Sequence, residues 1–178
     1  LFFLVQLTAI GVLGALPTFD QLENPKNNLA TEIISEDGIV LGKYFFENRS
    51  RVRYNEIPEN LINALISTED VRFREHSGID GRALLRAIFG AVIGKSSSGG
   101  ASTISQQLAK MLFTEQPSSG IERVMQKLKE WIIAAQLEKR YTKDEILTMY
   151  LNRFDWVNNA VGIKSAAQVY FNKAPIEL

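Results

Sequence analysis

The chain has 178 residues, which is enough for one domain with a buried core. Its 20 basic and 20 acidic residues balance, so the composition gives no general attraction to nucleic acid. It contains no cysteine and a single histidine, His76, which excludes disulfides, thiolate metal sites and a multi-histidine zinc site within the chain.

Residues 1–16 form an apolar run without a charged residue. As a helix this run spans about 24 Å, short of the ~30 Å hydrocarbon core of a bilayer. Because the chain starts inside the run and without Met, we expect a truncated transmembrane anchor. A signal-peptide core is the competing interpretation, although no small-x-small cleavage site stands out before Pro17. A buried helix is the third interpretation, and the polar stretch that begins at Pro17 argues against it.

Residues 17–57 predict a linker with a small β element. The turn-forming residues 36–38 separate two apolar, β-branched runs at 33–34 and 39–41, which is typical of a hairpin. This element suggests no chemistry of its own.

From residue 58 onward the pattern becomes helical, because apolar residues recur three and four positions apart. We expect helices at about 58–69, 82–93, 103–113, 121–140, 143–152 and 159–171, with loops at 95–100 and 115–120. Thr142 and Glu145 match a capping box, and small residues at 162–167 suit close packing. The predicted apolar stripe of the longest helix is Val124, Leu128, Trp131, Ile132 and Ala135. The sequence therefore predicts a mainly α-helical domain over residues 58–178.

A Gly/Ser loop at 95–100 leads into a helix that begins with two hydroxyl residues, Ser102 and Thr103. Either hydroxyl can cap the helix, and the same helix end attracts an anion. Thr103, Gln107 and Lys110 share one face, which offers a hydroxyl, an amide and an ammonium to a sugar or a phosphate. Taken alone, a linker followed by a solvated helix face is the simpler interpretation. The missing GxxxxGKS/T spacing argues against ATP or GTP.

Glu69 follows the apolar face of its predicted helix, where partial desolvation suits a carboxyl group to proton transfer. Taken alone, the pair of Glu69 and Asp70 is equally explained by a solvated helix end. His76 alone reads as a hydrogen-bonded residue of a turn, and Phe73 as a core residue.

Glu130 follows Gln126 and Lys127 by about one helical turn. An intrahelical ion pair is the simpler interpretation. The functional one is a second carboxylate in a cleft, as in chemistry at glycosidic bonds. Between Arg82 and Lys143, ten Lys or Arg residues stand against four Glu. This basic middle favours an anionic ligand or an anionic membrane surface.

Four stretches together resemble the motifs of the peptidoglycan glycosyltransferases, glycosyltransferase family 51. Residues 69–78 match EDxxFxxHxG, residues 100–110 match GxSTIxQQxxK, residues 127–130 match most of RKxxE, and residues 143–152 match KxxILxxYLN. One such motif is a weak signal, whereas four in the family's order are a strong one. The resemblance covers about residue 58 to the end of the chain and outweighs the simpler interpretations given above.

The resemblance implies a lysozyme-like helical fold with a membrane-proximal jaw, in a class A penicillin-binding protein or a monofunctional relative. It implies a hexosyltransferase that polymerises lipid II with inversion and releases undecaprenyl pyrophosphate during cell-wall biogenesis. The implied partners are lipid II, the growing glycan strand, the membrane, other cell-wall synthesis proteins and a transpeptidase domain after Leu178. The implied location is the bacterial inner (cytoplasmic) membrane, with a single span and an extracytoplasmic catalytic domain.

The resemblance also implies roles for individual residues. Glu69 is the expected general base for the acceptor 4-hydroxyl. Glu130 is expected to assist the departing pyrophosphate directly, through water or through a divalent cation (Mg or Mn), and no metal-ligating residue is assigned. The expected substrate-binding residues are Asp70, Phe73, His76, Ser102, Thr103, Gln107, Lys110, Arg123, Lys127 and Asn152.

Gln126 departs from the family pattern, which has Arg at this position. A neutral amide replaces a guanidinium that can grip phosphate with two hydrogen bonds, and Arg123, one turn earlier, is the candidate substitute. Two other functions remain open. A lysozyme-like lytic enzyme would need neither an anchor nor diphosphate-binding cations, and a non-catalytic scaffold for lipid II would predict loss of Glu69 or Lys110.

Overall fold

The computed structural model of the chain describes residues 16–17, 31–37, 40–44, 48–49, 51–94, 100–113, 119–158 and 160–178. The expected anchor therefore lies outside the described residues except for Leu16, as do most of the two loops expected at 95–100 and 115–120. In the described ranges, no helix has both the length and the apolar character needed to cross a membrane.

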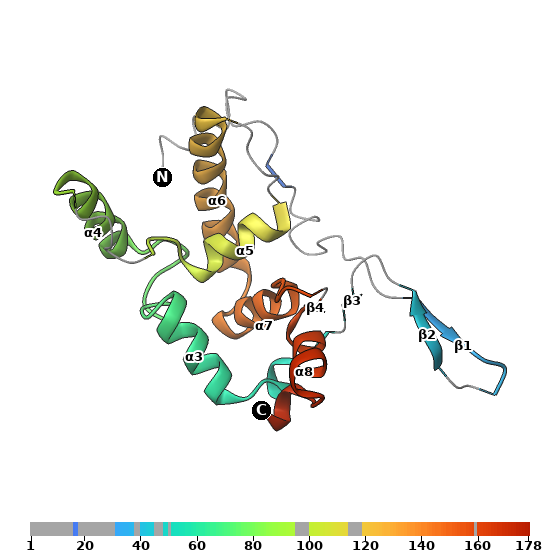
Figure 1. Cartoon of the computed structure of the whole chain (residues 1–178). Helices are drawn as coiled ribbons and strands as arrows, with labels where there is room; N and C mark the ends of the chain where they lie inside the picture. Colours follow the sequence, from blue (N-terminus) through green and yellow to red (C-terminus); the bar gives the residue numbers. More distant parts are fainter. Residues whose placement is uncertain are drawn as a thin grey trace.

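Helices dominate the described chain, which confirms the predicted fold class (Figure 1). α5 packs against both α6 and α7 at the centre of the molecule. In chain order the helices are α3 (Glu59–Glu69), α4 (Gly81–Val92), α5 (Ile104–Phe113), α6 (Gly120–Arg140), α7 (Lys143–Arg153) and α8 (Ile163–Phe171). Two short 3-10 helices, η1 (Tyr54–Glu56) and η2 (Pro175–Glu177), are the other helical elements of the described ranges.

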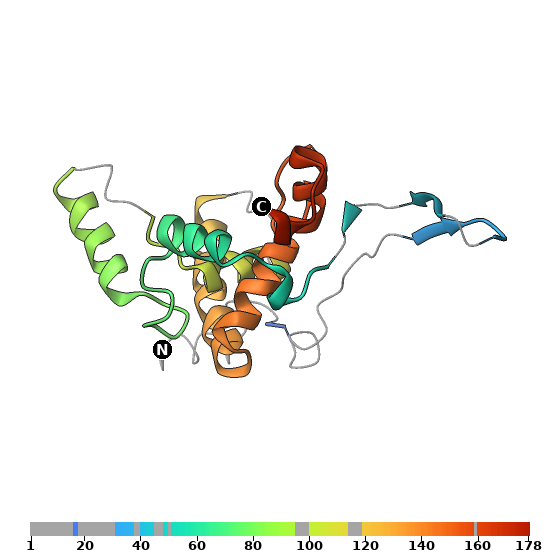
Figure 2. The same cartoon turned by 90° about the horizontal axis from the view of Figure 1, so that it is seen from below.

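The strands in the described part of the chain are short and form two separate pairs. β1 (Thr31–Ile34) pairs antiparallel with β2 (Val40–Tyr44), which confirms the predicted hairpin, and the pair lies apart from the helices in both views (Figures 1 and 2). β3 (Asn48–Arg49) pairs in parallel with β4 (Ala160–Val161), just before α8. The segment after the hairpin therefore joins the helical body.

The core is one cluster that surrounds α5 and α7. α5 buries Ile104, Leu108 and Ala109 together with two polar residues, Ser105 and Gln106. Because α5 is enclosed on several sides, its position is fixed by packing rather than by helix propensity. The helix can therefore serve as a rigid support for the partly exposed side chains that it carries.

The predicted apolar stripe of α6 is largely wrong. Only Ile132 of its five members is buried, and Val124 is 61% exposed. The buried face instead carries Glu130, Ile133, Ala134 and Leu137. The physical reason is that three stripe members, Val124, Leu128 and Trp131, line a cavity rather than the core.

The last helix begins at Ile163 rather than at residue 159, because Ala160 and Val161 form β4. Gly162 between them and the helix has φ +83°, and a Cβ placed there would lie 2.8 Å from the carbonyl oxygen of Asn152. Only glycine meets both conditions without strain, so this residue allows α8 to pack closely on α7.

α4 stands at the side of the central helices (Figures 1 and 2) and leaves part of its apolar surface uncovered. Leu85 and Phe89 on this helix and Ile93 just after it are all more than half exposed. Asp80 caps the helix, since its carboxylate accepts from the backbone N–H groups of Arg82 and Ala83 at 3.0 and 3.1 Å.

Candidate active site

The start of α5 is held by groups of the chain itself. The Thr103 hydroxyl donates to the carbonyl of Gly78 at 2.7 Å and accepts from the backbone N–H of Gln106 at 3.2 Å. The Ile104 N–H donates to Asp70 Oδ2 at 3.1 Å. Thr103 does cap the helix, as predicted, but it is 2% exposed and lies against the loop of the first motif. The anion at this helix start is the Asp70 carboxylate.

Asp70, Phe73 and His76 form the buried support of that loop. His76 Nε2 lies 3.0 Å from each carboxylate oxygen of Asp70. The Lys143 ammonium donates to the His76 carbonyl at 2.6 Å and lies 4.3 Å from the centre of the Phe73 ring. These contacts fasten the loop to α5 and α7, and they fix the position of Glu69 at the end of α3.

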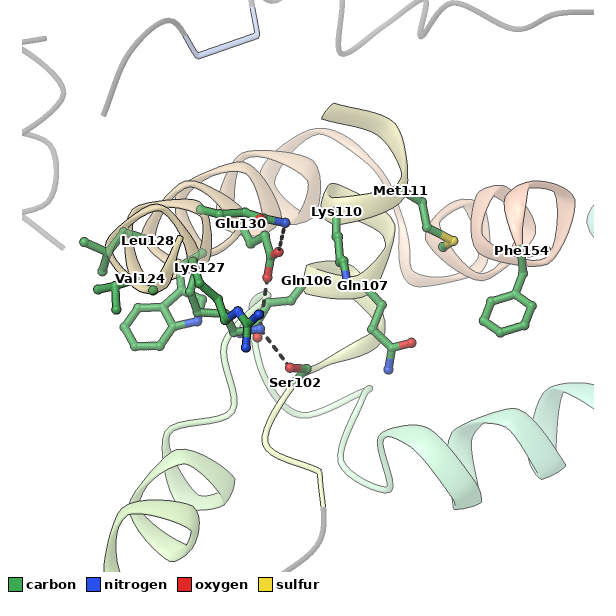
Figure 3. Close-up of a pocket in the computed structure, with 14 residues that line it drawn as sticks. Ser102, Gln106, Gln107, Lys110, Met111, Val124, Lys127, Leu128, Glu130 and Phe154 are labelled. Carbon is green, nitrogen blue, oxygen red and sulfur yellow. Dashed lines mark hydrogen bonds and ion pairs between the residues drawn. The ribbon is translucent and has the colours of Figure 1, made fainter. Parts of the chain in front are cut away.

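Six of the predicted site residues line a cavity of about 1220 Å³ between α5 and α6 (Figure 3). They are Ser102, Gln107, Lys110, Arg123, Lys127 and Glu130. Met111, Val124, Leu128, Trp131 and Phe154 add an apolar part to the wall. The cavity thus combines three cationic side chains, one carboxylate and apolar surface.

Glu130 lies on the cavity wall although it is only 5% exposed. Gln126 Nε2 donates to its Oε1 at 3.1 Å, and Lys127 Nζ donates to its Oε2 at 3.0 Å. Lys127 Nζ also donates to Ser102 Oγ at 2.8 Å, which links α6 to the residues before α5 (Figure 3). Glu130 is therefore both a member of an intrahelical ion pair and a cavity residue.

Glu69 reaches the cavity through Gln107. Gln107 Nε2 donates to Glu69 Oε2 at 2.8 Å, and the Tyr150 hydroxyl donates to Gln107 Oε1 at 2.9 Å. The partial burial that we predicted for Glu69 is wrong, since the residue is exposed. As the last residue of α3, it extends beyond the apolar face that the earlier turns bury.

Asn152 is not among the residues that line the cavity. Its side-chain amide makes two hydrogen bonds with the backbone of Val52, accepting at 2.8 Å and donating at 2.9 Å. Asn152 thereby ties α7 to the segment that follows β3, 100 residues earlier in the chain.

Tyr150 and Glu138 were not predicted as site residues from the sequence. The Glu138 carboxylate is nearly buried, accepts from Ser105 Oγ at 2.5 Å and pairs with Lys143 at 2.7 Å. Tyr150 is 1% exposed. Both are polar residues on the same helix face as apolar residues, and this pattern could have identified them, because a buried polar group needs a hydrogen-bond partner.

The residues present do not fit a resident divalent cation. No group of three His, Asp or Glu side chains within the described ranges is placed to hold a metal ion. Glu130 is the carboxylate expected to bind such a cation. One of its oxygens accepts a hydrogen bond from an amide and the other accepts one from an ammonium group.

Residues 37–178 match the family model described as Transglycosylase. The chain is 39% identical over 163 residues to penicillin-binding protein 1A of Escherichia coli K12, and 39% identical over 144 residues to penicillin-binding protein 1F of Bacillus subtilis 168. It is 36% identical over 174 residues to penicillin-binding protein 1A of Neisseria lactamica. These matches cover 92%, 81% and 96% of this chain, but 19%, 20% and 21% of the relatives.

The chain thus spans about a fifth of the length of the curated relatives it matches. The family match extends through all four motifs of the sequence and through the α5–α6 cavity that two of them line. It confirms the resemblance from which the site residues were assigned. The chain belongs to the transglycosylase family, the peptidoglycan glycosyltransferases.

Proposed function

We propose that the chain polymerises lipid II into glycan strands and releases undecaprenyl pyrophosphate. The observation that carries the proposal is the arrangement of two carboxylates around one helix. Glu69 is hydrogen-bonded to α5 through Gln107, and Glu130 lines the cavity between α5 and α6 together with three cations. A base and a set of phosphate-binding cations are the two requirements of glycosyl transfer from a diphosphate.

Glu69 acts as the general base in this proposal. Gln107 occupies one carboxylate oxygen, Oε2, while Oε1 has no hydrogen-bond partner among the described side chains. Oε1 takes the proton of the acceptor 4-hydroxyl as that oxygen attacks the anomeric carbon of the donor. The new C1–O4 bond forms on the face opposite the breaking bond to phosphate, so the configuration inverts.

Lys110, Arg123 and Lys127 receive the leaving group. As the bond between the anomeric carbon and the phosphate oxygen breaks, negative charge grows on the diphosphate, and nearby cations stabilise this charge most in the transition state. Glu130 keeps the Lys127 ammonium at a fixed place, between itself and Ser102. Ser102 and Gln107 add hydrogen-bonding groups for sugar or phosphate oxygens.

We further propose a location at the outer face of the bacterial cytoplasmic membrane, with α4 as the membrane-proximal jaw. The uncovered apolar side chains Leu85 and Phe89 support this placement, because they lie on a helix that also carries Arg82 and Arg86. The relatives are named for penicillin binding. We therefore propose a transpeptidase domain as a partner of this chain in the whole protein.

The first test is lipid II polymerisation by the full-length protein in detergent, with Glu69→Gln compared with the wild type. Loss of the base should lower the rate of glycan-strand formation at least a hundredfold, while lipid II binding stays intact. Glu59→Gln is the matched control, because Glu59 is an exposed carboxylate in the first turn of the same helix. We expect Glu59→Gln to polymerise at the wild-type rate.

Other outcomes would replace the proposal. Polymer from Glu69→Gln at the wild-type rate would remove Glu69 as the base. Binding of lipid II without polymer from any variant would indicate the non-catalytic scaffold. Cleavage of finished peptidoglycan would indicate the lytic enzyme.

A further inference from the structure

Two hydrogen bonds in series connect the hydrophobic core to the exposed carboxylate of Glu69. The Tyr150 hydroxyl donates to Gln107 Oε1 at 2.9 Å, and Gln107 Nε2 donates to Glu69 Oε2 at 2.8 Å. Tyr150 is 1% exposed and lies in the last turn of α7, whereas Glu69 is exposed at the end of α3. Gln107, on the buried helix α5, is the link between them.

The direction of the series is fixed by chemistry. Burial raises the pKa of Tyr150, and the negative charge of Glu69 raises it further, so the phenol keeps its proton and donates it. An amide oxygen only accepts, so Tyr150 determines which end of the Gln107 amide faces it. The amide NH₂ group is then directed at the carboxylate. The opposite orientation would place the amide oxygen against a carboxylate oxygen.

We propose that Tyr150 is a positioning residue for glycosyl transfer. It holds Gln107 in the orientation that keeps the Glu69 carboxylate aimed at the acceptor hydroxyl. The inference rests on the proposed role of Glu69 as the base. A surface carboxylate at a helix end has several rotamers, and a base must lie within hydrogen-bond reach of the proton it takes. A partner anchored in the core restricts that freedom, which is how a rigid surrounding shell supports catalysis.

The aromatic ring of Tyr150 can be separated from its hydroxyl. The ring packs on Phe154, with the ring centroids 5.3 Å apart, and Phe154 in turn lines the cavity. Tyr150→Phe keeps this packing and removes only the donor. The experiment compares kcat and KM for lipid II in the full-length protein. We expect kcat to fall about tenfold, the effect of one lost hydrogen bond on a transition state, with KM changed by less than about twofold.

The matched control is Tyr170→Phe. The Tyr170 hydroxyl donates to the carbonyl of Trp156 at 2.6 Å, at a position outside the cavity lining. This variant also loses a tyrosine hydroxyl, together with its hydrogen bonds to the Trp156 and Val157 carbonyls and the one it accepts from Asn158. We expect its kcat to equal that of the wild type, so a general effect of losing a hydroxyl would appear in both variants.

A double-mutant cycle distinguishes positioning from a merely structural role. If Tyr150 acts through Gln107, then Tyr150→Phe should cause no further loss of kcat in a Gln107→Met background. Losses that multiply would overturn the inference, as would a wild-type kcat for Tyr150→Phe. If Tyr150→Phe melts below the assay temperature, Gln107→Met alone serves as the test. It removes the same link from a half-buried site, and a wild-type kcat would again overturn the inference.

Glu69→Gln, measured in parallel, keeps the two proposals apart. An active Glu69→Gln would remove the proposed base, whatever Tyr150 does. An inactive Glu69→Gln together with a fully active Tyr150→Phe would leave the base in place and overturn only the positioning role.

Discussion

Glu130 is a nearly buried carboxylate with both oxygens engaged, one by Gln126 and the other by Lys127. A buried charge needs such partners, because a carboxylate left without them costs several kcal/mol. Lys127 therefore has two tasks. It compensates Glu130 within the protein, and in the proposed reaction it faces a phosphate in the cavity. Gln126 contributes a hydrogen bond but no charge.

Gln126→Arg should keep or raise the rate of polymerisation. The substitution adds a guanidinium beside Glu130 on the cavity wall, and a guanidinium can bind a phosphate with two parallel hydrogen bonds. We expect kcat/KM for lipid II to be equal to the wild-type value or up to about tenfold higher, measured with the full-length protein. A severe loss would show that the site depends on the amide.

Arg123→Gln supplies the comparison. Arg123 lines the same cavity one turn before Gln126, so it is the nearest substitute for the missing guanidinium. We expect Arg123→Gln to lower kcat/KM and the added Gln126→Arg to restore it. Failure of that rescue would mean that the two positions do not serve the same phosphate.

At the scale of one element, α4 depends on a single carboxylate. Asp80 caps the helix and pairs with Arg72, whose Nε and Nη2 lie 3.0 and 2.6 Å from its oxygens. Burial alone would raise the pKa of Asp80, but the hydrogen bonds from Arg72 and from the Ala83 N–H outweigh it, so the pKa is lowered. A carboxyl group whose pKa is lower in the folded state stabilises the fold when it is ionised.

Asp80→Asn should therefore lower the free energy of unfolding at pH 7 by about 1–2 kcal/mol. The sign follows from the lowered pKa. The contribution of Asp80 is complete above the unfolded pKa of about 4 and is lost as the pH falls through the lower pKa of the folded state. Urea denaturation at pH 7 and near pH 3 would measure it, and the difference between Asp80→Asn and the wild type should shrink at the acidic pH.

Asp144→Asn is the control for this experiment. Asp144 pairs with Arg74 at 3.3 Å, and both side chains are about half exposed, so the pair contributes little. We expect a loss of less than about 0.5 kcal/mol. An equal loss of unfolding free energy for both variants would contradict the proposed stabilisation of α4 by Asp80.

At the scale of the whole molecule, Gly162 is a point where distant segments meet. It follows β4, precedes α8 and touches the backbone of Asn152, which itself holds Val52 beside β3. Gly162→Ala should destabilise the fold by about 2 kcal/mol or more, because φ +83° disfavours a Cβ and the nearest oxygen is backbone. Urea denaturation would measure this loss. Gly81→Ala, with no atom within 4 Å of the added Cβ, should be neutral or slightly stabilising.

Features with local signals were predicted correctly from the sequence. The capping box of Thr142 and Glu145 forms as expected, and so do the hairpin and the helices between residues 58 and 153. Features that depend on residues far away in the sequence were not predicted. Thr103 turns to a carbonyl 25 residues earlier, and Val124 faces a cavity. A helical pattern identifies the residues that share a face, but it does not say which neighbour covers that face.

The site residues could be named in advance because motifs are recognised by residue type and spacing. The sequence did not show which of them would line the cavity and which would form the buried support, because that depends on hydrogen bonds between separate elements. Asp70 and Lys110 belong to different motifs of the same family, yet Asp70 holds the start of α5 while Lys110 lines the cavity. Tyr150 shows the same limit, because its partner Gln107 is 43 residues away in the sequence.

The hydrogen bonds of α5 also set the spacing between two parts of the proposed site. Lys127 is fastened to Ser102, just before the helix, and Glu69 is fastened to Gln107, in its first turn. The separation between the proposed base and the proposed phosphate-binding Lys127 is thus set by a few residues of helical rise, about 1.5 Å each. One residue inserted between Ser102 and Gln107 would rotate Gln107 by about 100° about the axis and carry its amide away from Glu69. The proposed reaction therefore fixes the number of residues between Ser102 and Gln107.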